Sequence, residues 1–307
     1  MDLVATLRSK IDRLRDGDHS AGLQSVLSHI EVAFRHLSRG QADNDESAFT
    51  DVIYRCNQAF EGSIKEAYRV LADKEPQRKK PFQIETYLED NNVFRDRVMA
   101  QFTNYRTEWR NPSTHDYNLD FDESESFLAI VSVSAFACVL IDQIAGRLAH
   151  DDAATEADAK HVALKQGVDV DNTSLIELAT EIFREFTRQH HADSANQTEI
   201  QLMGALTGFF SALVPSLDVT LDYKLSPESH ERGDLLLRHD ESKVLVELKR
   251  TNSPRLLKGG LLQLQSYMPL TGIKNAILFM YPPGGGELLQ EEHRSSDGGR
   301  IIVLRSE

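Results

Sequence analysis

The chain has 307 residues, of which 40% are hydrophobic and 27% are charged, a composition typical of a soluble globular protein. Its length suits two domains of ordinary size, each able to bury its own core. The net charge of −14 argues against a protein that coats nucleic acid without specificity. The only cysteines, Cys56 and Cys138, exclude a disulfide framework, and the N-terminus lacks the apolar core of a signal peptide. We therefore expect a cytoplasmic protein.

The first 150 residues predict a series of amphipathic helices. Apolar residues recur three and four positions apart, which places them on one face of a helix. Three such stripes run over Leu23–Leu37, Phe49–Ala67 and Phe94–Trp109. We expect the third helix to end at Asn111–Pro112, because the residue before a proline is biased away from the helical conformation. The pattern favours an all-α helical bundle.

The most apolar segment of the chain is Phe127–Ile141. It is too short to span a bilayer comfortably, so it predicts a buried helix that continues to about His150. We expect no contact with a membrane.

A polar, weakly patterned stretch separates this bundle from the second half of the chain. We predict a helical domain over residues 1–155, a linker over 156–172 and an α/β domain over 173–307. The predicted order in the second half is two helices, three strands, a helix and two strands, over residues 174–188, 199–214, 218–225, 233–238, 243–249, 256–268, 275–281 and 300–305. The fold class is therefore α+β in two domains, with a mixed sheet flanked by helices in the second.

The predicted β-hairpin over residues 233–249 carries three charged residues that strand pairing can bring together. Glu247 and Lys249 lie two apart, so on a strand both side chains leave the same face. Asp234 lies at the start of the first strand, and pairing the strands brings it toward Glu247. Adjacent carboxylates repel one another, and a bound divalent cation relieves that repulsion. An ammonium beside such a cation can orient a water molecule or steady developing negative charge.

The segment Asp234…Glu247-Leu248-Lys249 resembles the Asp…(Glu/Asp)-X-Lys pattern of the PD-(D/E)XK nuclease superfamily. Glu199, in a helical segment upstream, lies where many members carry an acidic metal ligand. Gln263 and Tyr267 match the Gln-X-X-X-Tyr helix of the RecB-like branch. One departure is that Gly233 stands where the family name has proline.

The resemblance implies a restriction-endonuclease-like fold and a nuclease that uses Mg²⁺ or Mn²⁺. Asp234 and Glu247, with the Leu248 carbonyl and Glu199, would hold the metal. Lys249 would orient the attacking water, and Gln263 and Tyr267 would position the strand. Just downstream, the segment 249–258 carries cations and no acid, which makes Arg250, Arg255 and Lys258 candidate nucleic-acid-binding residues.

A second group of residues lies near the end of the third apolar stripe, where Arg110 and His115 are separated by four residues. This spacing, with Asn111 after the arginine, resembles the Arg-X4–6-His motif of HEPN domains, helical bundles found in many prokaryotic RNases, toxins and defence proteins. In that family the motif acts on RNA at a dimer interface without metal. His115 would be general acid or base, Arg110 would bind the scissile phosphate, and Asn111 would help to position the site. The structural alternative is that Arg110 pairs with Glu108 or Asp116 while His115 caps a turn.

Together the two resemblances indicate a metal-dependent nuclease that cuts DNA, acting as an effector of prokaryotic antiphage defence or restriction. The alternative is a metal-independent HEPN ribonuclease that cuts RNA, or a bundle that only dimerises or senses a nucleotide. We expect a homodimer formed through the bundle and allow for a regulatory partner.

Overall fold

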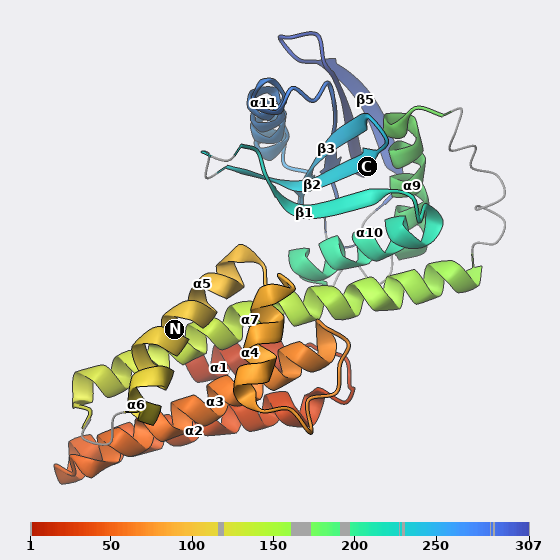
Figure 1. Cartoon of the computed structure of the whole chain (residues 1–307). Coiled ribbons are helices and arrows are strands. Elements are labelled where there is room, and N and C mark those ends of the chain that lie inside the picture. The colour runs from red at the N-terminus through yellow and green to blue at the C-terminus, as the bar shows by residue number, and fades with distance from the viewer. Residues whose placement is uncertain are drawn as a thin grey trace. The chain divides into compact units, whose positions relative to one another are not determined.

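The computed structural model describes residues 2–115, 120–160, 173–190, 197–226, 228, 231–282, 284 and 286–306 (Figure 1). The chain divides into two compact units, Met1–Leu148 and Ala149–Glu307. The first is helical and the second contains a six-stranded mixed sheet, so the protein is of the α+β class. Of the predicted linker, residues 156–160 belong to a helix that ends at Lys160, and residues 161–172 lie outside the described part of the chain.

The N-terminal unit is a bundle of helices. Its elements are α1 (Leu3–Ile11), α2 (Ser20–Asp43), α3 (Ser47–Val70), α4 (Pro81–Asp90), α5 (Asp96–Tyr105), the π-helical turn η1 (Arg106–Arg110), α6 (Asn111–His115) and the part of α7 (Glu123–Lys160) up to Leu148. The apolar stripes that predicted α2 and α3 lie in one continuous core. Aromatic rings fill its centre: the ring of Phe60 lies 4.9 Å from that of Tyr105 and 5.3 Å from that of Phe136.

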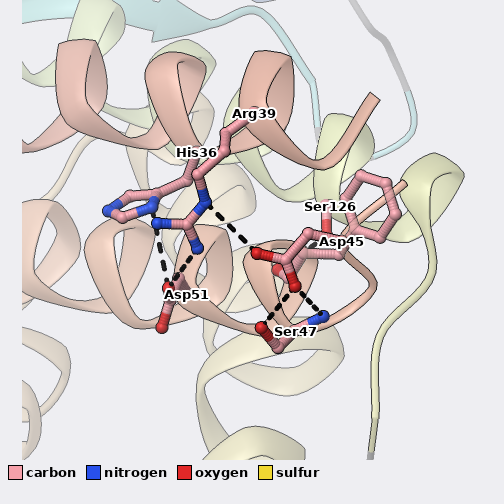
Figure 2. A network of polar contacts seen from close by, with 7 residues as sticks. His36, Arg39, Asp45, Ser47, Asp51 and Ser126 are labelled. Atoms are coloured by element: carbon pink, nitrogen blue, oxygen red, sulfur yellow. Dashed lines mark hydrogen bonds and ion pairs between the residues drawn. The ribbon is translucent and has the colours of Figure 1, made fainter. Parts of the chain in front are cut away.

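The turn between α2 and α3 is held by a polar network (Figure 2). The Arg39 guanidinium lies 3.4 Å from Asp45 and 3.0 Å from Asp51. Asp45 also accepts hydrogen bonds from the hydroxyl and the backbone N–H of Ser47, at 2.6 and 3.1 Å. Ser126 of α7 donates to the Phe49 carbonyl at 2.8 Å inside the core. Since these groups satisfy one another, the network fixes the turn and we assign it a structural role.

The prediction that the third helical segment ends at Asn111–Pro112 was wrong. The chain runs from α5 through η1 directly into α6. The Asn111 N–H donates to the carbonyl of Arg106, five residues back, which is the wider π-helical turn. Pro112 is then the second residue of α6 and follows the π-helical turn directly, so this proline lies inside the helical run and does not end it.

Helix α7 includes the predicted apolar segment and extends beyond it at both ends. Among the described residues it is the one helix long and apolar enough to cross a membrane, with a mean hydropathy of 2.1 over 18 residues. Buried core helices of soluble proteins pass the same test. Its residues between Ala129 and Leu148 contribute to the core of the N-terminal unit, which agrees with the expectation of a buried helix.

The C-terminal unit contains the rest of α7, α9 (Leu175–His190), α10 (Glu199–Leu213), β1 (Asp218–Lys224), β2 (Arg232–His239), β3 (Ser242–Lys249), α11 (Pro254–Thr271), β4 (Asn275–Met280), β5 (Leu288–Arg294) and β6 (Arg300–Ser306). The strand order is β1-β2-β3-β4-β6-β5. Strands β3, β4 and β6 are parallel, while β1–β2, β2–β3 and β5–β6 are antiparallel. Helix α11 is the crossover that joins the parallel strands β3 and β4.

Helices cover both faces of this sheet. Leu235 and Leu237 of β2 share one core with α9 and α10. Leu236 of β2 and Leu245 of β3 belong to a second core, together with residues of α11. Because successive side chains on a strand point to opposite faces, Asp234, Glu247 and Lys249 belong to the face that α11 covers.

Candidate active site

Strands β2 and β3 deliver two carboxylates to one end of their hairpin. Their antiparallel register pairs Leu235 with Val246, and the next residues along it are Asp234 and Glu247. Asp234 accepts a hydrogen bond from the Leu248 backbone N–H at 2.7 Å. Lys249, two residues after Glu247, donates from its ammonium to Glu247 Oε1 at 2.5 Å. The structure thus brings together the three residues of the predicted hairpin site.

The carboxylates occupy a poorly solvated position, and Glu247 is only 2% exposed. Burial, followed by the charge of Asp234, raises the pKa of Glu247 to about 7 despite the opposing charge of Lys249. Burial also raises the pKa of Asp234, against the effect of the Leu248 N–H. Burial disfavours the charged form of Lys249, but its bond to Glu247 and the surrounding carboxylates outweigh that effect and raise its pKa. The ammonium therefore stays charged beside a carboxyl pair that binds a proton readily.

Helix α11 places two polar side chains next to this pair. Gln263 Nε2 donates to the Tyr267 hydroxyl at 2.8 Å, as their spacing of four on one helix permits. The Gln263 amide is near enough to Glu247 to lower the pKa of that carboxyl. Burial, together with the charges of Glu247 and Glu231, raises the pKa of Tyr267. The two residues of the Gln-X-X-X-Tyr pattern therefore lie beside the hairpin residues, although α11 is separate from them in sequence.

The oxygen atoms of this group suit a hard divalent cation. Glu247 Oε2 is buried and has no hydrogen-bond donor among the described residues. Mg²⁺ commonly binds through one or two carboxylates and completes its coordination with waters and substrate phosphates. In the described part of the chain no three His, Cys, Asp or Glu side chains are arranged to hold one ion. Glu199 therefore does not join Asp234 and Glu247 as a third ligand in this arrangement.

The remaining residues predicted for this site lie around it. Glu199, the first residue of α10, is exposed, and its charge helps to raise the pKa of Lys249. Arg255 and Lys258, near the start of α11, are exposed. Arg250 is half-buried instead, and its guanidinium donates to the Gln197 carbonyl at 3.2 Å. Two of the three predicted nucleic-acid-binding cations are thus accessible, and the third is held by the protein.

Asp222 is a neighbour of the site that sequence patterns did not single out. The register of β1 with β2 pairs Leu221 with Leu235 and Tyr223 with Gly233, and it passes over Asp222. Asp222 has a φ of 52°, in the left-handed region that L-residues rarely adopt in a strand. Its charge adds to the rise in the pKa of Asp234. An aspartate within an otherwise regular strand sequence does not indicate a left-handed backbone, so this feature is evident only in the structure.

In the N-terminal unit, the structure pairs Arg110 with a residue that sequence analysis missed. Arg110 lies 3.6 Å from the Glu85 carboxylate of α4, and it donates to the Asn111 side chain at 3.1 Å. Burial raises the pKa of Glu85, although Arg110 and then Arg106 oppose that rise. Among the described residues, the ionic partner of Arg110 is thus Glu85 rather than Glu108. The side chain of His115 and all of Asp116 lie outside the described residues.

Further hydrogen bonds anchor this turn to α3. The Tyr105 hydroxyl donates to Asn57 at 3.0 Å, and the Asn57 amide donates to the Ser113 hydroxyl at 2.9 Å. Ser113 in turn donates to the Arg110 carbonyl at 3.1 Å. The backbone that carries Arg110 and Asn111 is therefore fixed from several directions.

Comparisons with protein-family models, with curated proteins and with solved structures find no match to this chain.

Proposed function

We propose that this protein is a metal-dependent nuclease of the PD-(D/E)XK type that hydrolyses phosphodiester bonds in DNA. The observation that carries the proposal is the convergence of Asp234, Glu247 and Lys249 at one end of the β2–β3 hairpin, on the face that α11 covers. Their neighbours on that face, Gln263 and Tyr267, are the residue types expected for the RecB-like branch.

The order of elements also supports this proposal. Helix α10 precedes the antiparallel strands β1, β2 and β3, and α11 then crosses over to the parallel strand β4. A restriction-endonuclease-like core has the same order of helix, three strands, helix and strand. We therefore propose that fold for the C-terminal unit.

The proposed chemistry assigns a role to each residue. Asp234, Glu247 and the Leu248 carbonyl would hold Mg²⁺ or Mn²⁺, which when bound polarises the scissile phosphate and lowers the pKa of a bound water. Lys249 keeps its proton beside Glu247, so its ammonium can orient the attacking water and stabilise developing negative charge. Gln263 and Tyr267 would position the strand to be cut. Arg255 and Lys258, exposed on the adjoining helix, would contact its phosphates.

Metal removal tests the proposal directly. With purified protein and supercoiled plasmid, we expect nicked and linear products in Mg²⁺ or Mn²⁺ and none in EDTA, because neither carboxylate can activate water without the ion. Returning Mn²⁺ in excess over the chelator should restore cleavage. DNA cleavage that persists in EDTA would rule out the metal-dependent mechanism.

We further propose a cytoplasmic effector of antiphage defence or restriction, dimeric through the N-terminal unit and under the control of a regulatory partner. This setting follows from the two family resemblances.

A second candidate function is a metal-independent HEPN ribonuclease. The observation in its favour is that Arg110 ends a π-helical turn and donates a hydrogen bond to the side chain of Asn111, the first residue of α6. Such turns occur frequently at functional sites. Since Arg110 pairs with Glu85, a phosphate would have to displace that carboxylate.

RNA cleavage in EDTA distinguishes this second candidate from the first. If the site is active, single-stranded RNA is cut without metal to 2′,3′-cyclic phosphate ends, and His115→Ala lowers the rate by about a hundredfold, the usual contribution of a general acid or base. Asp234→Asn should leave that activity unchanged. Intact RNA after incubation with the wild-type protein would limit the N-terminal unit to a non-catalytic role.

A further inference from the structure

Arg250 differs from the other cations that follow β3. Its side chain is half-buried and donates to the Gln197 carbonyl at 3.2 Å, whereas Arg255 and Lys258 are exposed. Its electrostatic neighbours include the Tyr281 hydroxyl and the Glu199 carboxylate. Partial burial of a guanidinium is unfavourable unless such groups compensate it. The surroundings of Arg250 are therefore those of an internal contact rather than of a solvated phosphate-binding residue.

The carbonyl that Arg250 contacts lies at the start of α10. Gln197 is followed by the N-cap Thr198, whose hydroxyl accepts from the Gln201 N–H, and then by Glu199, the first helical residue. A hydrogen bond to Gln197 therefore fixes the backbone from which Glu199 projects. The Glu199 carboxylate acts electrostatically on Lys249, the same ammonium that binds Glu247.

We propose that Arg250 is a positioning residue whose hydrogen bond to Gln197 holds the N-terminus of α10 near the end of β3, and with it the Glu199 side chain. The Lys249 ammonium then keeps its ion pair with Glu247 within electrostatic range of the Glu199 carboxylate. This inference rests on the proposed nuclease function, and it assigns to Arg250 an internal role in place of the phosphate contact that its sequence position predicts.

The test combines a double-mutant cycle with a measurement that does not depend on activity. The variants are Arg250→Gln, Glu199→Gln, the double variant and Arg250→Lys, with Lys243→Gln at the other end of β3 as the matched control. We expect Arg250→Gln and Glu199→Gln each to lower kcat at saturating Mn²⁺ by about tenfold, while KM for plasmid stays within about twofold. The double variant should be no slower than either single variant. Both changes would act through the same effect, the charge of Glu199 on Lys249, so their costs should not add. Arg250→Lys should recover part of the rate.

Hydrogen exchange followed by mass spectrometry reports the contact itself. Without Mn²⁺ or DNA, Arg250→Gln should speed amide exchange in the first turn of α10, residues 199–203, and Lys243→Gln should not. Unchanged exchange in Arg250→Gln, or losses in kcat that add in the double variant, would overturn the proposal. If Arg250→Gln instead raised KM at constant kcat and weakened the salt dependence of KM, Arg250 would be a nucleic-acid-binding residue and the proposal would be wrong. A wild-type protein that cuts no DNA would refute the nuclease function and the catalytic part of this inference, while the exchange experiment would still decide the contact.

Discussion

Asp234→Asn is expected to lower the rate of DNA cleavage by about a thousandfold, because it removes one charged metal ligand and with it several kcal/mol of transition-state stabilisation. The substitution keeps the size of the side chain and an oxygen that can accept from the Leu248 N–H, so the hairpin should stay folded. Initial rates of plasmid nicking in Mn²⁺ give the measurement.

The same experiment separates the metal ligands from their charged neighbour. Lys249→Met removes the ammonium next to Glu247 and should lower kcat by about a hundredfold, as the loss of one electrostatic stabiliser typically does. Lys243→Gln, at the far end of β3, should cleave at the wild-type rate. Wild-type cleavage by both Asp234→Asn and Lys249→Met would place the catalytic site elsewhere.

Gly208→Ala is expected to destabilise the C-terminal unit by about 3 kcal/mol, at the upper end of the range for overpacking. A Cβ added at Gly208 of α10 would lie 2.1 Å from the carbonyl oxygen of His150 in α7. That atom belongs to helix backbone, so the two helices must separate to admit the methyl group. Calorimetry of the full chain should show the corresponding unfolding transition lowered by roughly 10 °C.

Gly259→Ala provides the matched control for that substitution. Gly259 is also a helical glycine of the C-terminal unit, but a Cβ there would meet nothing within 4 Å. Alanine should therefore stabilise α11 by about 0.5 kcal/mol, since it restricts the unfolded chain. If both alanine variants behaved alike, the close approach of α10 to α7 would not govern stability.

The sequence predicted the parts of the fold that bury a regular apolar pattern. The stripes of α2, α3 and α9 and the apolar runs of β2 and β3 all lie in the cores. Period-two alternation also indicated that Glu247 and Lys249 share a face. Helix α11 joins β3 to β4 and packs on that same face, so its residues Gln263 and Tyr267 lie near Glu247 and Lys249.

The elements that sequence patterns missed have weak apolar signals. Strand β5 is an edge strand that pairs on one side only and is largely solvated. Its sequence, Leu-Leu-Gln-Glu-Glu-His-Arg, is therefore mostly polar and lacks an apolar pattern. Helix α4 is short and buries only Ile84, Glu85 and Leu88. The Glu85–Arg110 pair was missed for the same reason, because it depends on where α4 packs. Likewise, Arg250 and Arg255 lie in the same cationic segment and look equivalent in the sequence. Only the hydrogen bond from Arg250 to the Gln197 carbonyl distinguishes them.

The edge strands of the sheet, β1 and β5, affect how the protein can associate with itself. An edge strand has unpaired backbone N–H and C=O groups to which a strand of another chain can bind. Charged side chains or a local backbone distortion disfavour such pairing. On β5, Glu291 and Glu292 form ion pairs with Arg305 and Arg300 of β6. On β1, the left-handed backbone at Asp222 interrupts the regular ladder. Both edge strands therefore carry features that disfavour intermolecular sheet extension, the step by which exposed strands start fibrillar aggregation.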